Sequence, residues 1–237
     1  MARQIKGVVF DLDGTLLDDI GLARDLPFLV AESYGISVDP NEREQIITKV
    51  FETLSGSSSK IALARALLWI AKKIGLPWYR RGDFIKRADK IYKEKILESN
   101  LFPYAMETVK IVLNLYGKVG ILSTTPLQEI QFRLQKRPEF LSLFGTDIIG
   151  GDGVKKIKPH PEGLILLAKR WNVLPQELVF IGDMALDMTA AQRAGCISIG
   201  FLGGHATRST LEKAGAQYII KELLELPPLL NSIESAI

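Results

Sequence analysis

Residues 7–15 read Gly-Val-Val-Phe-Asp-Leu-Asp-Gly-Thr, and the interpretation of the whole 237-residue chain starts from this stretch. Four apolar residues are followed at once by Asp11, Asp13 and Gly14. An apolar run without alternation is typical of a strand that is buried on both faces, as in a parallel sheet. Because ligands gather at the carboxyl ends of strands in such a sheet, the two aspartates stand where a functional site is expected.

Five further segments are likewise apolar without alternation and end in polar or glycine residues. They span residues 119–122, 147–149, 178–181, 197–201 and 217–220. From residue 118 onward helical segments alternate with them, and residues 125–128 and 209–212 carry capping-box spacing that predicts helix starts at Thr125 and Ser209. Strand and helix in alternation predict an α/β fold with a doubly wound, mostly parallel sheet and a Rossmann-like core.

Residues 18–97 break this alternation, because apolar residues recur there at helical spacing and no β-type run intervenes. We predict an all-α cap domain of residues 18–97, inserted into an α/β core of residues 1–17 and 98–237. Trp69 and Trp78 are interpreted as packing residues of this insertion.

Composition restricts the class of protein. Hydrophobic residues make up 47% and charged residues 24% of the chain, as in ordinary globular proteins. No apolar run approaches the roughly 18–20 residues of a membrane helix, and the apolar run near the N-terminus is too short for a signal peptide. Cys196 is the single cysteine and cannot form an internal disulfide. We therefore expect a cytoplasmic protein without a membrane partner.

The net charge of +3 does not by itself indicate a nucleic-acid partner. Lysine and arginine are interleaved with aspartate and glutamate along most of the chain, including the densest basic stretch at residues 80–95. This pattern predicts the solvated face of a helix rather than a nucleic-acid-binding surface. The oligomeric state is left open by the sequence.

The ends of the predicted strands bring further reactive side chains to the same edge of the sheet. Ser123 follows the second strand, and Asp183 follows the strand at residues 178–181, with Asp187 four residues later. Lys158 lies in a strand-to-helix loop. Neighbouring carboxylates repel one another, and a divalent cation bound by oxygen relieves the repulsion. The arrangement favours phosphoryl transfer assisted by Mg²⁺.

These four segments, in this order, resemble the motifs of the haloacid dehalogenase-like hydrolases. The segments are Asp-Leu-Asp-Gly-Thr-Leu at residues 11–16, Ser123, the Lys158 of Lys-Pro-His-Pro, and Gly-Asp-Met-Ala-Leu-Asp at residues 182–187. The resemblance covers residues 7–220, and the helical insertion is similar to the α-helical cap of that family. The chain most resembles phosphoglycolate phosphatases and neighbouring phosphatases of small phosphomonoesters. It departs from their pattern at two positions: Met184 stands where those relatives often have Ser, and Thr124 stands where they often have Asn. Neither difference changes the set of charges.

The resemblance implies a role for each matched acid. Asp11 would be the nucleophile that forms an aspartyl phosphate, and Asp13 would protonate the leaving oxygen and then activate water. The Asp11 carboxylate, the Asp13 backbone carbonyl and Asp183 would bind Mg²⁺. Asp187 would be either a further ligand or a group that orients Lys158.

The resemblance also implies contacts to the substrate. Ser123 and the backbone N–H of Thr124 would hydrogen-bond phosphoryl oxygens. Lys158 would hold the nucleophile ionised; Lys155 and Lys156 are rivals for this role, and the Pro-His-Pro that follows favours Lys158. In the cap, the corresponding loop of the family would place Ser57, Lys60 and Arg65 against the non-reacting part of the substrate.

The residue at position 13 separates related activities. Relatives that displace halide have Tyr there and relatives that cleave phosphonates have Ala, whereas an alkoxide leaving group needs the proton that Asp13 can donate. We therefore expect a Mg²⁺-dependent phosphatase of a small phosphorylated metabolite, such as phosphoglycolate or a sugar phosphate. A sugar-phosphate phosphomutase, or a pyrophosphatase or nucleotidase of the same superfamily, stays open. A non-catalytic binding protein would be expected to lack Asp11 or Asp13.

Overall fold

The computed structural model describes residues 4–54 and 60–235, and the chain divides into two compact units. The first unit comprises Met1–Asp18 and Asn100–Ile237, and the second comprises Asp19–Ser99. The insertion expected at residues 18–97 overlaps this second unit, and its role as a cap stays a prediction.

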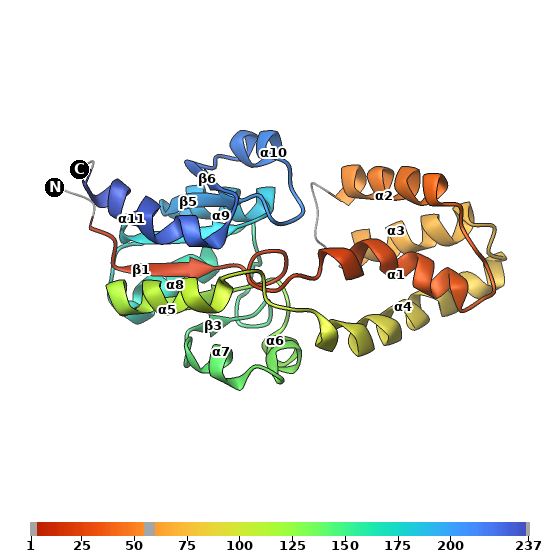
Figure 1. Cartoon of the computed structure of the whole chain (residues 1–237), viewed down its shortest axis with the longest axis horizontal. Coiled ribbons are helices and arrows are strands. Elements are labelled where there is room, and N and C mark those ends of the chain that lie inside the picture. The colour runs from red at the N-terminus through yellow and green to blue at the C-terminus, as the bar shows by residue number, and fades with distance from the viewer. Residues whose placement is uncertain (1–3, 55–59, 236–237) are drawn as a thin grey trace. The chain divides into compact units, whose positions relative to one another are not determined.

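The first unit is built on a six-stranded parallel sheet in the order β3-β2-β1-β4-β5-β6 (Figure 1). The strands are β1 (Gly7–Phe10), β2 (Val119–Leu122), β3 (Ile148–Ile149), β4 (Leu178–Gly182), β5 (Ile197–Phe201) and β6 (Tyr218–Ile220). Strand β1 lies between β2 and β4, so that Val9 faces Gly120 on one side and Phe180 on the other. The chain runs outward from β1 to β3 and then returns to β4 on the other side. The crevice of a doubly wound sheet therefore opens where β1 and β4 end.

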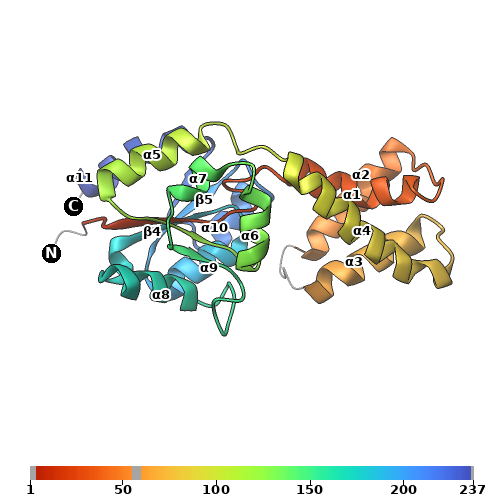
Figure 2. The same cartoon turned by 90° about the horizontal axis from the view of Figure 1, so that it is seen from below.

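Helices cover both faces of this sheet. The longer ones are α5 (Ala105–Tyr116), α8 (Glu162–Trp171), α9 (Ala185–Ala194) and α11 (Leu226–Ser235). Helices α5 and α11 lie on one face, and α8 and α9 lie on the other (Figure 2). The remaining helices are the short α6 (Leu127–Leu134), α7 (Pro138–Ser142) and α10 (Arg208–Lys213), with the 3₁₀ turns η3 (Pro175–Glu177) and η4 (Leu223–Glu225). Every residue of β1, β2, β4 and β5 is buried. The predicted doubly wound parallel sheet is confirmed.

The predicted start of α6 is wrong in detail. Thr125 does not cap this helix; α6 begins at Leu127, and Pro126 directly before it provides no side-chain cap. The backbone N–H of Leu127 instead donates to Oδ1 of Asp152, at 2.8 Å. The capping group therefore comes from a loop 25 residues further along the chain. This contact ties the turn after β2 to the loop after β3.

The predicted start of α10 is also wrong, by a smaller shift. Thr207, rather than Ser209, precedes the helix, and its hydroxyl accepts the backbone N–H of Thr210 at 3.3 Å. Ser209 lies inside the first turn. The spacing identified the helix but not which of several hydroxyl residues caps it.

The second unit is all-helical over its described residues. Its elements are α1 (Ile20–Glu32), α2 (Pro40–Leu54), α3 (Lys60–Lys73), η1 (Trp78–Arg80), α4 (Arg81–Lys95) and η2 (Ile96–Glu98). Two apolar clusters hold these helices together, one around Phe84 and one around Phe28. The interpretation of Trp69 and Trp78 as packing residues is wrong, since they are 41% and 79% exposed. Among the described residues, none of the helices combines the length and the apolar character that crossing a bilayer requires.

The long-range cap of α6 gives a first prediction. Replacing Asp152 by Ala removes the acceptor of the Leu127 N–H, and we expect the free energy of unfolding to fall by about 1 kcal/mol, the usual cost of losing a helix cap. Asp152→Asn keeps an oxygen acceptor and should lie closer to wild type. Urea denaturation of the three proteins measures both changes, and an unchanged midpoint in Asp152→Ala would show that this contact does not stabilise the turn.

Candidate active site

Asp11 is the first residue after β1 and lies at the centre of the sheet edge. Its backbone N–H donates to the carbonyl oxygen of Ile181 at 2.8 Å, which continues the pairing of β1 with β4. Its Oδ1 accepts the backbone N–H of Leu12 at 2.7 Å and lies 2.8 Å from Nζ of Lys158. The side chain is buried. One carboxylate oxygen of Asp11 is thus held by two donors before any ligand arrives.

Lys158 connects Asp11 with Asp187. Its Nζ lies 2.8 Å from Oδ1 of Asp11 and 2.6 Å from Oδ1 of Asp187, and all three side chains are buried. The other oxygen of Asp187 accepts the backbone N–H of Met184 at 2.9 Å, immediately before α9. Asp187 therefore contacts the lysine with one oxygen and caps its own helix with the other.

The structure separates the three candidate lysines. Lys158 is buried and paired with the acids, whereas Lys155 and Lys156 are exposed. The backbone N–H groups of Lys155 and Lys156 donate to the carboxylate of Glu162, at 2.9 and 3.1 Å. Only Lys158 of the three is brought next to Asp11.

Asp183 follows β4 and is enclosed by two loops. Its Oδ1 accepts the hydroxyl of Thr15 at 3.2 Å, and its Oδ2 accepts the backbone N–H of His205 at 2.8 Å. A Cβ on Gly14, whose φ is +75°, or on Gly204 would collide with the Asp183 carboxylate. Both positions therefore require the close backbone approach that glycine allows.

The contribution of the loop at residues 203–205 was missed by the sequence analysis. In this loop, His205 contacts Asp183 through its backbone N–H. A backbone donor carries no residue-type signal, so side-chain motifs do not identify it. Thr15, by contrast, belongs to the Asp-Leu-Asp-Gly-Thr segment, and its hydroxyl could have been proposed as a hydrogen-bond donor to a carboxylate of the site.

Asp11, Asp183 and Asp187 form an acidic cluster with carboxylate oxygens within 4.8 Å of one another. Burial raises the pKa of Asp11 well above its ordinary value, and the charges of Asp187 and Asp183 add to this effect, while Lys158 opposes it. Burial alone would lower the pKa of Lys158, but Asp11 and Asp187 reverse that and raise it. Three buried carboxylates around one ammonium group provide hard oxygen donors and excess negative charge. The residues therefore fit a divalent cation such as Mg²⁺.

The side chain of Asp13 lies outside this acidic cluster. Its Oδ2 accepts the hydroxyls of Thr125 at 3.0 Å and Ser123 at 3.4 Å, and its Oδ1 is paired with the guanidinium of Arg133. Arg133 is buried on α6 and also binds Glu129. Arg133 and the side-chain role of Thr125 were both missed, because neither belongs to a recognised motif and Thr125 was interpreted as a helix cap.

Ser123 and Thr124 form the turn between β2 and α6. The backbone N–H of Ser123 donates to the carbonyl of Ile149 at 3.0 Å, and its hydroxyl oxygen accepts the N–H of Thr125 at 3.1 Å. Thr124 is half-buried. The structure thus brings Ser123 beside Asp13, and the phosphoryl contacts of Ser123 and Thr124 stay predictions.

The predicted substrate contacts of the second unit stay predictions as well. Ser57 lies outside the described residues, and so does the side chain of Lys60, the first residue of α3. Arg65 is exposed on the same helix.

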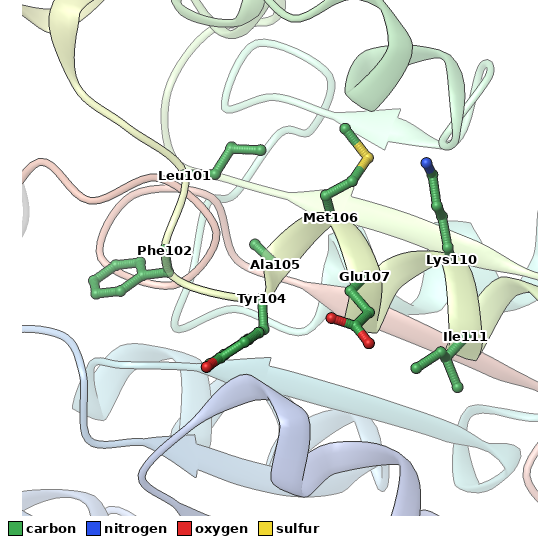
Figure 3. A pocket seen from close by; sticks show the side chains of 8 residues that line it. All are labelled: Leu101, Phe102, Tyr104, Ala105, Met106, Glu107, Lys110 and Ile111. Atoms are coloured by element: carbon green, nitrogen blue, oxygen red, sulfur yellow. The ribbon is translucent and has the colours of Figure 1, made fainter.

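An open cavity of about 550 Å³ lies at the start of α5, apart from these acids (Figure 3). It is lined by Leu101, Phe102, Tyr104, Ala105, Met106, Glu107, Lys110 and Ile111. All of these residues belong to one continuous segment, and none is a predicted site residue. The candidate active site is identified instead by the convergence of charged side chains at the ends of β1 and β4.

Comparison with known proteins decides the family. A family model described as haloacid dehalogenase-like hydrolase matches residues 5–195. The chain belongs to the haloacid dehalogenase-like hydrolases. This hydrolase is 28% identical over 246 residues to the phosphoglycolate phosphatase of Escherichia coli K12, covering 97% of this chain and 94% of that one. It is 29% identical over 247 residues to the phosphoglycolate phosphatase of Salmonella choleraesuis, with the same coverage.

Solved structures extend the comparison to the fold. A predicted phosphoglycolate phosphatase from Haemophilus somnus aligns with a TM-score of 0.78 at 21% identity, over 95% of this hydrolase and 98% of that chain. A provisionally assigned beta-phosphoglucomutase from Thermotoga maritima aligns with a TM-score of 0.77 at 25% identity, over 98% and 100%. The family and fold predicted from the four motifs are confirmed, and the relatives support the predicted enzyme class, a phosphatase.

The raised pKa of Asp11 predicts how the metal-free protein responds to pH. Because the folded state binds this proton more tightly than the unfolded chain, the contribution of Asp11 to stability falls as pH rises above 3.8. Asp11→Asn removes the buried charge and leaves Lys158 paired with Asp187. In the presence of a chelator at pH 7, we expect Asp11→Asn to be more stable than wild type by about 1 kcal/mol, the size of a typical single substitution.

Urea denaturation between pH 4 and pH 8 checks this expectation, with Asp147→Asn as a control that removes an acid outside the cluster. The difference between Asp11→Asn and wild type should shrink toward the acidic end. An Asp11→Asn protein that is less stable than wild type at pH 7 would contradict the electrostatic description of the site.

Proposed function

We propose that this hydrolase is a Mg²⁺-dependent phosphatase of a small phosphorylated metabolite, with phosphoglycolate as the first substrate to test, and that it acts through an aspartyl phosphate on Asp11. The observation that carries the proposal is the buried cluster of Asp11, Lys158, Asp183 and Asp187 where β1 and β4 end. The phosphoglycolate phosphatases that match nearly the whole chain support the choice of substrate. A cytoplasmic location is part of the same proposal.

Phosphoryl transfer begins with attack by Asp11. Oδ1 already accepts two donors, so Oδ2 is the oxygen that bonds to phosphorus while the bond between phosphorus and the ester oxygen breaks. The proton that the departing alkoxide requires comes from the Asp13 carboxyl. Lys158 favours the ionised form of Asp11 and offsets charge near the phosphoryl group. The Ser123 hydroxyl and the Thr124 backbone N–H donate to phosphoryl oxygens.

Hydrolysis of the aspartyl phosphate completes the cycle. Asp13, now ionised, takes a proton from a water molecule that attacks phosphorus, and the bond to Asp11 breaks to release phosphate. Asp11, Asp183 and the backbone carbonyl of Asp13 would hold Mg²⁺. The ion, when bound, offsets the repulsion between the carboxylate and the anionic phosphoryl group. Asp187 has one oxygen on Lys158 and the other on the Met184 N–H, which favours an orienting role over direct coordination.

Substrate selection is assigned in this proposal to the second unit. Ser57, Lys60 and Arg65 would contact the part of the substrate that does not react. Lys60→Ala should then change KM or the ranking of substrates more than kcat, and unchanged kinetics on several phosphate esters would remove this part of the proposal.

A phosphomutase is the second candidate, favoured by the likeness to the Thermotoga maritima structure. In a mutase the phosphoryl group on Asp11 would pass to a sugar hydroxyl instead of water. Product analysis separates the two activities, because a phosphatase releases inorganic phosphate and a mutase returns an isomerised sugar phosphate.

The proposal predicts the activity of two variants. Asp11→Asn removes the nucleophile, and we expect phosphate release from phosphoglycolate to fall by at least about a thousandfold, as when a covalent nucleophile is lost in other enzymes. Asp147→Asn, which removes an acid paired with Arg170 outside the site, should retain wild-type turnover. A phosphate-release assay measures both.

Metal dependence is checked in the same assay. Chelation should abolish the wild-type activity, and Mg²⁺ should restore it. Equal turnover by Asp11→Asn and wild type, or full activity after chelation, would contradict the proposed chemistry.

A further inference from the structure

Arg133 lies in the last turn of α6, seven residues after Pro126, and its guanidinium is buried against the Asp13 side chain. Its Nη1 pairs with Oδ1 of Asp13, and its Nη2 pairs with Glu129 at 2.5 Å. The Arg133 side chain is 7% exposed, while the side chains of Asp13 and Glu129 are 22% and 34% exposed. A buried guanidinium is costly unless it is paired, so each of these two carboxylates helps to stabilise Arg133 in this place.

The guanidinium is suited to fixing a direction as well as a charge. It is planar, its donors form a rigid fork, and it stays protonated at every working pH. Glu129 precedes Arg133 by one helical turn and fixes one side of the fork, so the other side points at Asp13 in a defined orientation. The start of α6 is fixed in turn by Asp152.

Among the described residues, the three side-chain donors to the Asp13 carboxylate come from one segment of the chain. Ser123, Thr125 and Arg133 lie between the end of β2 and the end of α6. The two hydroxyls donate to Oδ2 of Asp13, and Arg133 donates to Oδ1. Without Arg133 the carboxylate keeps only the hydroxyl contacts on one oxygen, and rotation about its side-chain torsions is no longer opposed by an ion pair.

We propose that Arg133 is a positioning residue that holds the Asp13 carboxyl group where it exchanges a proton with the leaving oxygen. The inference rests on the proposed phosphatase function. In that step the bond between phosphorus and the ester oxygen breaks, a bond from phosphorus to Asp11 forms, and the Asp13 proton moves to the departing oxygen. Misplacement by about 1 Å can cost a hundredfold in rate, so a group that fixes this carboxyl contributes to the reaction without touching substrate.

The test compares two phosphate esters that differ in their need for the proton. The aryl ester is p-nitrophenyl phosphate, whose p-nitrophenolate group departs without being protonated. The alkyl ester is phosphoglycolate, whose alkoxide group must be protonated as it departs. With Arg133→Gln, we expect kcat/KM to fall about tenfold to a hundredfold for the alkyl ester and less than about threefold for the aryl ester, within the range of general acid catalysis. The ratio kcat/KM reports phosphoryl transfer and excludes the later hydrolysis step, which both substrates share.

Two further proteins establish that the effect acts through Asp13. Asp13→Asn should show the same dependence on leaving group. The double variant Asp13→Asn with Arg133→Gln should be no slower on the alkyl ester than Asp13→Asn alone, because residues that act as a unit are not additive.

Matched variants separate positioning from helix stability. Glu129→Gln removes the same helical ion pair but leaves the contact between Arg133 and Asp13, so it should show a smaller leaving-group effect than Arg133→Gln. Arg133→Lys keeps the charge and should recover part of the loss, and it carries the test if Arg133→Gln does not fold. Arg170 lies on α8 and is paired with Asp147, outside the site, so Arg170→Gln should behave as wild type.

Equal losses on both esters, or additive losses in the double variant, would overturn the proposal. If wild-type protein hydrolyses neither ester, the proposed function fails, and a crystal structure of Arg133→Gln then decides the positioning role by itself. The proposal expects the Asp13 carboxylate to leave Ser123 and Thr125 in that structure. A carboxylate that stays in place would overturn it.

Discussion

Repulsion among three buried carboxylates is the constraint on which the proposed chemistry depends. Asp11, Asp183 and Asp187 lie within reach of one another where β1 and β4 end, and Lys158 is paired with two of them. Burial and like charge raise the pKa of Asp11, so one ammonium group does not balance the cluster. This excess of negative charge is the reason for proposing that a cation and an anionic substrate bind here.

The fold accommodates this cluster through its backbone. The switch in strand order places β1 beside β4, which brings Asp11 and Asp183 together although they are far apart in the sequence. Gly14 and Gly204 let two loops approach the Asp183 carboxylate, and the N–H of His205 donates to it. The proposed mechanism assigns proton transfer to Asp13, whose carboxylate contacts Arg133, Ser123 and Thr125 of the β2–α6 segment.

The sequence predicted the features that are local or belong to a motif. Runs of apolar residues located the strands, and the ordered motifs led to Asp11, Lys158 and Asp183. It did not predict contacts between distant segments, because nothing in the residues near Leu127 indicates that Asp152 caps it. Arg133 was missed for the same reason, since an arginine on an amphipathic helix is usually solvated, and its burial depends on where Asp13 lies. Trp78 was misjudged because an aromatic residue in a helical segment is usually packed, and here it is exposed.

The central claim is that the acidic cluster binds a divalent cation, and the most direct measurement is a crystal structure soaked with Mn²⁺, located by its anomalous signal. Mn²⁺ prefers oxygen ligands in the same geometry as Mg²⁺. The account predicts one ion coordinated by carboxylate oxygens of Asp11 and Asp183, and loss of that ion in Asp183→Asn. A wild-type crystal with no ion among these acids, or an Asp183→Asn crystal that binds it equally well, would contradict the account.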